Sequence, residues 1–269
     1  MKKTTVPIEF VYQLFALIIA VIIVHGFYVS VVRPNASETI LEQTIQAERD
    51  PNYIKERSTW IIIKDLEQEA CFVLMIWALA IMGYKTKTII DERKLLDIDL
   101  ISIAEGMRIL PEDTREFSRQ LQALSTEKQN MVLPRALLNA LRLFNTTKNV
   151  QDVSSSTHTI FESESERLES ELSMIRYISW AIPSIGFIGT VRGIGEALGQ
   201  ADKAVQGDIA GVTQSLGVAF NSTFIALLIS IFLMFLVHQL QLLQERLVFD
   251  SENYTNDKLI QHMKSDIYQ

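Results

Sequence analysis

The sequence predicts an all-α membrane protein with four transmembrane helices and a large helical insertion between the second and the third. With 48% hydrophobic and 21% charged residues, the composition of the 269-residue chain would also fit a soluble domain. The distribution of apolar residues along the chain is what distinguishes the two classes. Apolar residues are concentrated in a few long runs, and most charged residues lie between them. In addition, no strand-like alternation of apolar and polar residues persists along the chain.

The candidate spans follow from length, because a helix needs about 20 apolar residues to cross a ~30 Å hydrocarbon core. The predicted spans are residues 8–32, 70–84, 174–198 and 212–237. The second is short unless residues 60–63 extend it. The third is the least apolar, since it contains Pro183, several glycines, Arg192 and Glu196.

Basic residues set the expected orientation, because they favour the cytoplasmic side. Lys2 and Lys3 precede the first span, which is longer than a signal-peptide core and lacks a clear cleavage site. We therefore expect an uncleaved signal anchor. Further basic residues follow the second span directly: Lys85, Lys87, Arg93 and Lys94. Both termini are then cytoplasmic, although five basic residues in the outer loop 33–69 run against the rule.

The predicted organisation divides the chain at the spans and places two loops outside the membrane. Helical spacing with breaks at Pro111 and Pro134 indicates that the insertion is helical. In order, the segments are the N-terminal tail and first span (1–32), a periplasmic loop (33–69), the second span (70–84), a cytoplasmic helical domain (85–173), the third span (174–198), a short periplasmic loop (199–211), the fourth span (212–237) and a cytoplasmic helical tail (238–269).

Several function classes are not supported. No dense Lys/Arg block suggests nucleic-acid binding, and no phosphate loop or nucleophile motif suggests an enzyme. Three histidines, His158, His238 and His262, lack metal-ligand spacing, so no metal site is expected. Cys71 lies inside an apolar run and is interpreted as a packing residue.

The third and fourth spans each have a face of small residues at helical spacing. On the third this face is Gly186, Thr190, Gly193 and Ala197, and on the fourth it is Ser215, Ala219, Ser222, Ala226 and Ser230. Small faces let helices approach closely in lipid. Taken singly, the hydroxyls are explained by packing or by bonds to their own helix. Together with Pro183, which frees a carbonyl and favours a kink, they also fit an ion path.

These two spans resemble the MotA/TolQ/ExbB proton channel family. The resemblance is carried by residues 182–191 (Ile-Pro-Ser-Ile-Gly-Phe-Ile-Gly-Thr-Val), by Gly193 and Ile194, and by residues 216–228 (Leu-Gly-Val-Ala-Phe-Asn-Ser-Thr-Phe-Ile-Ala-Leu-Leu). It covers about residues 174–240, and the rest of the chain is similar only in layout.

The resemblance implies a homopentamer in the bacterial inner membrane, surrounding two copies of a single-helix partner that carries a membrane aspartate and a periplasmic domain. The conducted ion would be a proton or Na⁺, with no cofactor. The expected ion-path residues are Thr190, Thr223, Asn221 and Ser222. The expected bend and packing residues are Pro183, Gly186, Gly189, Gly193, Ala219 and Ala226.

Two residues depart from the TolQ and ExbB pattern. Arg192 stands where such relatives carry a large aromatic residue, and Val218 stands where some carry a glutamate. The extra N-terminal span favours a MotA-like layout instead. Arg192 and Glu196 are four residues apart and are expected to pair. They are interpreted either as an interfacial pair or as a periplasmic mouth that screens cations.

The predicted function is an ion-conducting stator subunit that turns proton or sodium motive force into mechanical work. The alternative is a non-conducting scaffold or signalling subunit that works through its cytoplasmic helices. A neighbouring gene for a single-helix partner with a membrane aspartate would favour the motor. His25 in the first span is either a proton relay or, as the stronger interpretation, a packed or interfacial residue.

Overall fold

The computed structural model describes residues 8–50, 53, 56–103 and 106–264. Within these residues the secondary structure is helical, apart from one isolated β-bridge between Ile109 and Met263. The chain divides into two compact units. We call residues 1–83 and 174–237 the membrane unit, and residues 84–173 and 238–269 the helical unit.

Four helical stretches are long and apolar enough to cross a membrane, which confirms the predicted fold class at this level. They are 9–49, 66–93, 150–198 and 210–262, with lengths of 41, 28, 49 and 53 residues. Each exceeds the roughly 20 residues that a span needs, so part of each helix extends beyond the hydrocarbon core. Only 22–39% of the most apolar window of each is buried within one chain.

The N-terminal part of the membrane unit is more helical than predicted. Helix α1 (Ile8–Phe27) passes through a π-helix (Tyr28–Val32) into α2 (Arg33–Arg49), so the expected loop 33–69 begins as helix. Pro34 directly follows the π-helix, and because the helix is continuous there, its missing N–H leaves that point of the helix one hydrogen bond short. The short α3 (Thr59–Ile63) then leads into α4 (Leu66–Arg93).

Tyr28 and its neighbours on α1 attach this region to α3 and α4. Val24, Tyr28 and Val32 form a buried apolar cluster with Phe72 and Ile76 of α4 and with residues of α3. The Tyr28 and Phe72 rings are tilted, with centroids 6.4 Å apart. The π-helix therefore contributes Tyr28 and Val32 to the contact with α4.

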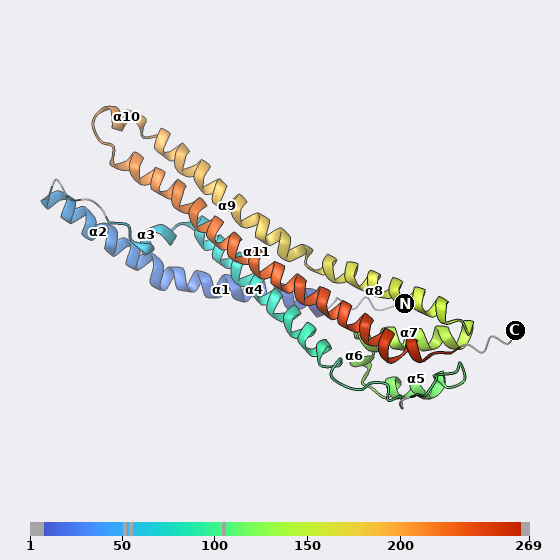
Figure 1. The fold of residues 1–269 in the computed structure, drawn as a ribbon. Helices are drawn as coiled ribbons and strands as arrows, with labels where there is room; N and C mark the ends of the chain where they lie inside the picture. The colour runs from blue at the N-terminus through green and yellow to red at the C-terminus, as the bar shows by residue number, and fades with distance from the viewer. Residues whose placement is uncertain (1–7, 51–52, 54–55, 104–105, 265–269) are drawn as a thin grey trace, which may run out of the picture. The chain divides into compact units, whose positions relative to one another are not determined.

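The other half of the membrane unit is a helical hairpin. Helix α9 (Ser173–Leu198) is followed by the short α10 (Ala201–Val205) and by α11 (Ala210–Lys258), and α9 and α11 run side by side in opposite directions (Figure 1). In line with the helical tail predicted for residues 238–269, α11 continues well past residue 237.

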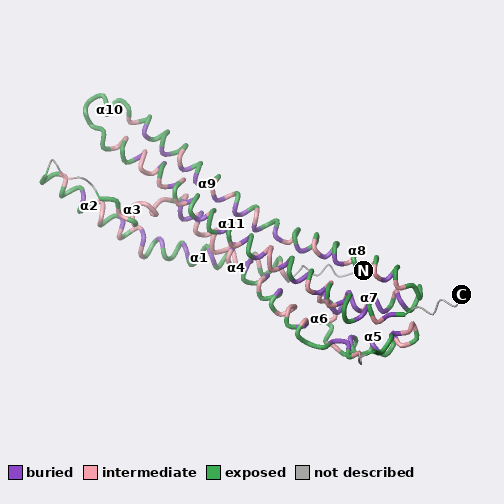
Figure 2. The backbone as a smooth tube through the Cα atoms, in the orientation of Figure 1, coloured by how far each residue is buried: buried purple, intermediate pink, exposed green. Residues whose placement is uncertain are grey.

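The helical unit has its own hydrophobic core. Its helices are α5 (Thr114–Gln122), α6 (Thr126–Gln129), α7 (Val132–Thr147), α8 (Val150–Glu171) and a 3₁₀ turn (Ile260–His262), together with the ends of α4 and α11. Leu137, Leu141 and Phe144 on α7 are fully buried at its centre. Figure 2 shows α7 largely buried, whereas α1 in the membrane unit is mostly exposed.

Candidate functional site

The contact between α9 and α11 is built on glycines. A Cβ atom added to Gly186 would lie 2.4 Å from the Ala226 Cβ, and one added to Gly193 would lie 2.7 Å from the Ala219 backbone nitrogen. At Gly189, an added Cβ would lie 2.5 Å from the Ser222 Cβ. The structure thus brings the two predicted small faces together, at a distance that no larger residue allows. We call this contact the seam.

A pair of threonine hydroxyls lies at the seam. Thr190 Oγ1 on α9 contacts Thr223 Oγ1 on α11 directly. Thr190 Oγ1 also donates to the Ala219 carbonyl at 3.0 Å, and Thr223 Oγ1 donates to the Gly186 carbonyl at 3.1 Å. Both side chains are only half-buried. The two hydroxyls therefore connect the helices and remain partly accessible from one side of the seam.

The hydrogen bonds of this pair have more than one possible arrangement. Thr190 Oγ1 lies 3.3 Å from the Gly186 carbonyl of its own helix as well. A hydroxyl has one proton and two lone pairs, so the contacts around the pair cannot all be made at once. Each hydroxyl can therefore donate its proton either to the other hydroxyl or to a carbonyl oxygen of Gly186 or Ala219. Such a pair is suited to coordinate a cation through its oxygen atoms or to take part in proton transfer.

Pro183 has a matched partner across the seam. Proline has no N–H, so the Ser179 carbonyl four residues earlier loses its helical donor. Ser230 Oγ of α11 donates to that carbonyl at 3.0 Å. An unsatisfied carbonyl in a lipid environment is costly. Ser230 therefore stabilises the position of α9 that carries the proline.

The other predicted ion-path residues do not all join the threonine pair. Ser222 is buried and donates to the Val218 carbonyl at 2.9 Å, and it contacts Gly189 rather than Thr190. Asn221 is half-buried on α11, two residues before Thr223 and hence roughly 200° around the helix from it. The pair formed by Thr190 and Thr223 is thus the part of the predicted set that comes together.

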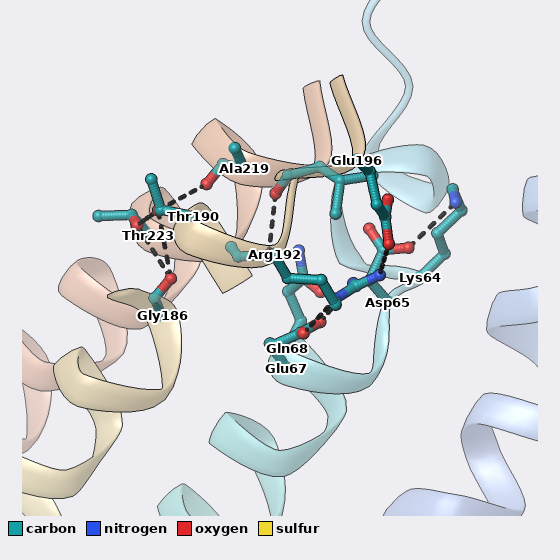
Figure 3. A network of polar contacts seen from close by, with 12 residues as sticks. Lys64, Asp65, Glu67, Gln68, Gly186, Thr190, Arg192, Glu196, Ala219 and Thr223 are labelled. Carbon is teal, nitrogen blue, oxygen red and sulfur yellow. Dashed lines mark hydrogen bonds and ion pairs between the residues drawn. The ribbon is translucent and has the colours of Figure 1, made fainter. Parts of the chain in front are cut away.

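Arg192 pairs with Glu196 as its spacing predicts, at 2.9 Å from Nη1 to Oε1, but its main partner is Glu67 of α4. The guanidinium binds the Glu67 carboxylate in bidentate form, with Nε–Oε1 at 2.7 Å and Nη2–Oε2 at 2.8 Å (Figure 3). Arg192 follows Thr190 by two residues and so lies roughly 200° around α9 from it. The charged group and the threonine pair consequently lie on different sides of α9.

The first turn of α4 carries polar residues that the sequence did not single out. Gln68 is fully buried, and its Nε2 lies 3.3 Å from Ser222 Oγ of α11 and 3.0 Å from the Ile62 carbonyl. Glu69 accepts from Arg33 at 2.6 Å and contacts the His25 ring at 2.7 Å. Successive positions on a helix point about 100° apart, so Glu67, Gln68 and Glu69 face three different neighbours. Three consecutive polar residues just before an apolar run are the sequence signal that could have indicated this.

Several ionisable groups in the helical unit have shifted pKa values, and Glu92 and His158 are two of them. Burial raises the pKa of Glu92, whose carboxylate accepts the backbone N–H of Val132 at 3.1 Å. The Glu252 carboxylate, 2.8 Å from His158 Nδ1, raises the pKa of His158 above its usual 6.5. Among the described residues, no cluster of three His, Cys, Asp or Glu is arranged to hold a metal ion.

Comparison with known proteins gives one match. Residues 128–253 match the model of the MotA/TolQ/ExbB proton channel family. The matched segment includes all of α7, α8 and α9 and most of α11, and therefore both threonines of the seam. It starts well before residue 174, so the similarity extends into the insertion, which was expected to resemble the family only in layout. No curated protein matches the chain.

Proposed function

From the MotA/TolQ/ExbB proton channel family domain that the chain carries over residues 128–253, we infer that this protein is the ion-conducting stator subunit of an inner-membrane motor. Proteins of this family are multi-pass components of bacterial inner membranes and are not enzymes. The driving ion is a proton or Na⁺. Both termini lie in the cytoplasm in this proposal, as the positions of the basic residues favour.

The threonine pair of the seam is the observation that carries the proposal. Thr190 and Thr223 place two hydroxyls and two carbonyl oxygens within hydrogen-bond reach of one another on a half-buried surface of α9 and α11. Within a membrane, polar groups at such a position mark an ion or proton route. The glycines of the seam keep that surface free of bulky side chains.

The proposed assembly is a homopentamer of this chain around two copies of a single-helix partner. Family members work with MotB/TolR/ExbD-type subunits. A single chain buries at most 39% of the most apolar window of any of its four long helices, so much of the apolar helix surface remains for other subunits and for lipid. The partner's membrane aspartate would face the threonine pair and exchange the ion with it.

The test is motor activity in cells for chains with Thr190→Val or Thr223→Val that still assemble with the partner. Valine keeps the shape of threonine but removes the hydroxyl, so we expect activity to fall by about 10²–10⁴-fold, the range for a lost proton-transfer group. Thr190→Ser and Thr223→Ser are the matched controls and should retain most activity. Full activity of both valine variants would overturn the ion-path assignment.

A further inference from the structure

The seam already joins α9 and α11 by close packing and by hydrogen bonds from Thr190 to Ala219, from Thr223 to Gly186 and from Ser230 to Ser179. Glycine has no side chain to interlock with its neighbour, and lipid supplies no hydrophobic force that holds two spans together. Directional contacts from a third helix would add to the hydrogen bonds of the seam and help to keep the two hydroxyls together.

The first turn of α4 supplies such contacts to both helices at the level of the threonine pair. Glu67 binds Arg192 of α9, and its Cγ lies 3.1 Å from the position of a Cβ on Gly189, the residue before Thr190. Gln68 binds Ser222 of α11, the residue before Thr223. One turn of one helix thus contacts α9 and α11 next to each threonine.

The chemistry of these contacts makes them directional. A bidentate pair between a guanidinium and a carboxylate fixes orientation as well as distance. The Glu67 side chain is only 11% exposed, and Gln68 is completely buried. The Arg192 side chain is 41% exposed, but a carboxylate left alone at the buried position of Glu67 is costly, which favours the pair. Because Arg192 lies on the side of α9 away from Thr190, holding it sets the rotation of the whole helix.

We propose that Glu67 and Gln68 form a clamp, a pair of positioning residues that holds α9 and α11 in the rotation at which the Thr190 and Thr223 hydroxyls meet. The inference rests on the proposed function, because the clamp matters for ion conduction only if the threonine pair is the ion path. The clamp itself touches neither the ion nor the threonines. It acts through Arg192 and Ser222.

The experiment measures the geometry of the pair directly. Thr190→Cys and Thr223→Cys are introduced together into the full chain with Cys71→Ala, and the chain is reconstituted in lipid with its partner. The initial rate of disulfide formation under a mild oxidant is followed by labelling the remaining thiols. Disulfides require Cα atoms about 4.4–6.8 Å apart in a suitable orientation, so the rate reports the rotation of the helices.

Glu67→Gln and Gln68→Leu in this background should each lower the rate roughly tenfold, the effect expected from the loss of a hydrogen bond to a charged or buried group. Glu196→Gln is the matched control, since it removes only the Arg192 partner on α9 itself, and its rate should stay within about twofold. In the Glu196→Gln chain, exchanging the charges with Glu67→Arg and Arg192→Glu should restore most of the rate.

Arg192→Lys provides a second, milder variant in case the others fail to fold. It keeps the charge but not the bidentate geometry, and it should give an intermediate rate. Unchanged rates in Glu67→Gln, Gln68→Leu and Arg192→Lys chains that remain folded would overturn the clamp. That result is separate from the test of the ion path. The rate of disulfide formation does not depend on ion conduction, and the motor activity of the Thr→Val variants is measured in chains with an unchanged clamp.

Discussion

The seam of the membrane unit and the core of the helical unit are both helix contacts, but they are built from opposite kinds of residues. Around α7 the core consists of large apolar side chains, with Leu137, Leu141 and Phe144 at or near 0% exposure. At the seam, Gly186 and Gly189 meet Ala226 and Ser222 instead. Water drives the first kind of contact through apolar burial, whereas lipid does not distinguish one apolar surface from another. At the seam, close approach of the helices and hydrogen bonds between them therefore stabilise the contact in place of apolar burial.

The largest effect should come from the core that depends on burial. Phe144→Ala removes a fully buried ring and should cost about 3–5 kcal/mol of local stability. Phe187→Ala on α9, where the ring is 65% exposed, should cost far less. Hydrogen exchange of the α7 amides should show the loss for Phe144→Ala only. Equal loss of protection in both variants would remove the distinction between the two regions.

At the seam the damaging change is the reverse, an added side chain. Gly186→Val forces atoms into the space of Ala226 and should cost about 1–3 kcal/mol of packing and abolish motor activity. Gly195→Ala on the same helix, with nothing within 4 Å of an added Cβ, should be tolerated. Activity and assembly of the two variants provide the measurement. If Gly186→Val is as active as Gly195→Ala, close approach is not required at the seam.

A smaller effect is expected where a hydrogen bond compensates for Pro183. Ser230→Ala leaves the Ser179 carbonyl without a donor and should cost about 0.6–1.7 kcal/mol. In a chain with Pro183→Ala, which restores the backbone N–H, the same serine change should cost almost nothing. Thermal unfolding of the two single variants and the double variant measures this coupling. Additive effects would show that Ser230 does not serve the proline.

The smallest effect concerns pH in the helical unit. Glu252 raises the pKa of His158, so the folded chain binds the His158 proton more tightly than the unfolded chain. This stabilisation is fully present below pH 6.5, the ordinary value, and is lost as the pH rises through the raised pKa. His158→Gln should flatten that part of the stability profile. An unchanged profile would mean that another group titrates there.

The elements that local pattern determines could be predicted from the sequence. The four apolar helices follow from hydropathy, and their presence is confirmed within the described residues. The small faces of α9 and α11 follow from residue spacing, and the structure brings them together. The Arg192 and Glu196 contact follows from the i,i+4 rule. Each of these depends on residues close together in the chain.

The contacts of α4 could not be predicted in the same way. Glu67 and Arg192 are 125 positions apart, and Gln68 and Ser222 are 154 apart. Hydropathy places Glu67, Gln68 and Glu69 at the end of the predicted loop 33–69 and predicts no contacts for them. Which helix each of them faces depends on the packing of α1, α9 and α11 around α4, and a single sequence does not contain that information.

The most direct test of the central claim is ion flux through the reconstituted complex. The chain and its partner are placed in liposomes, a proton or sodium gradient is imposed, and the flux is followed with an ion-sensitive dye. We predict that Thr190→Val and Thr223→Val each reduce the flux at least tenfold, while Thr190→Ser and Thr223→Ser stay within about threefold of the unchanged chain. Unchanged flux in both valine variants would contradict the account.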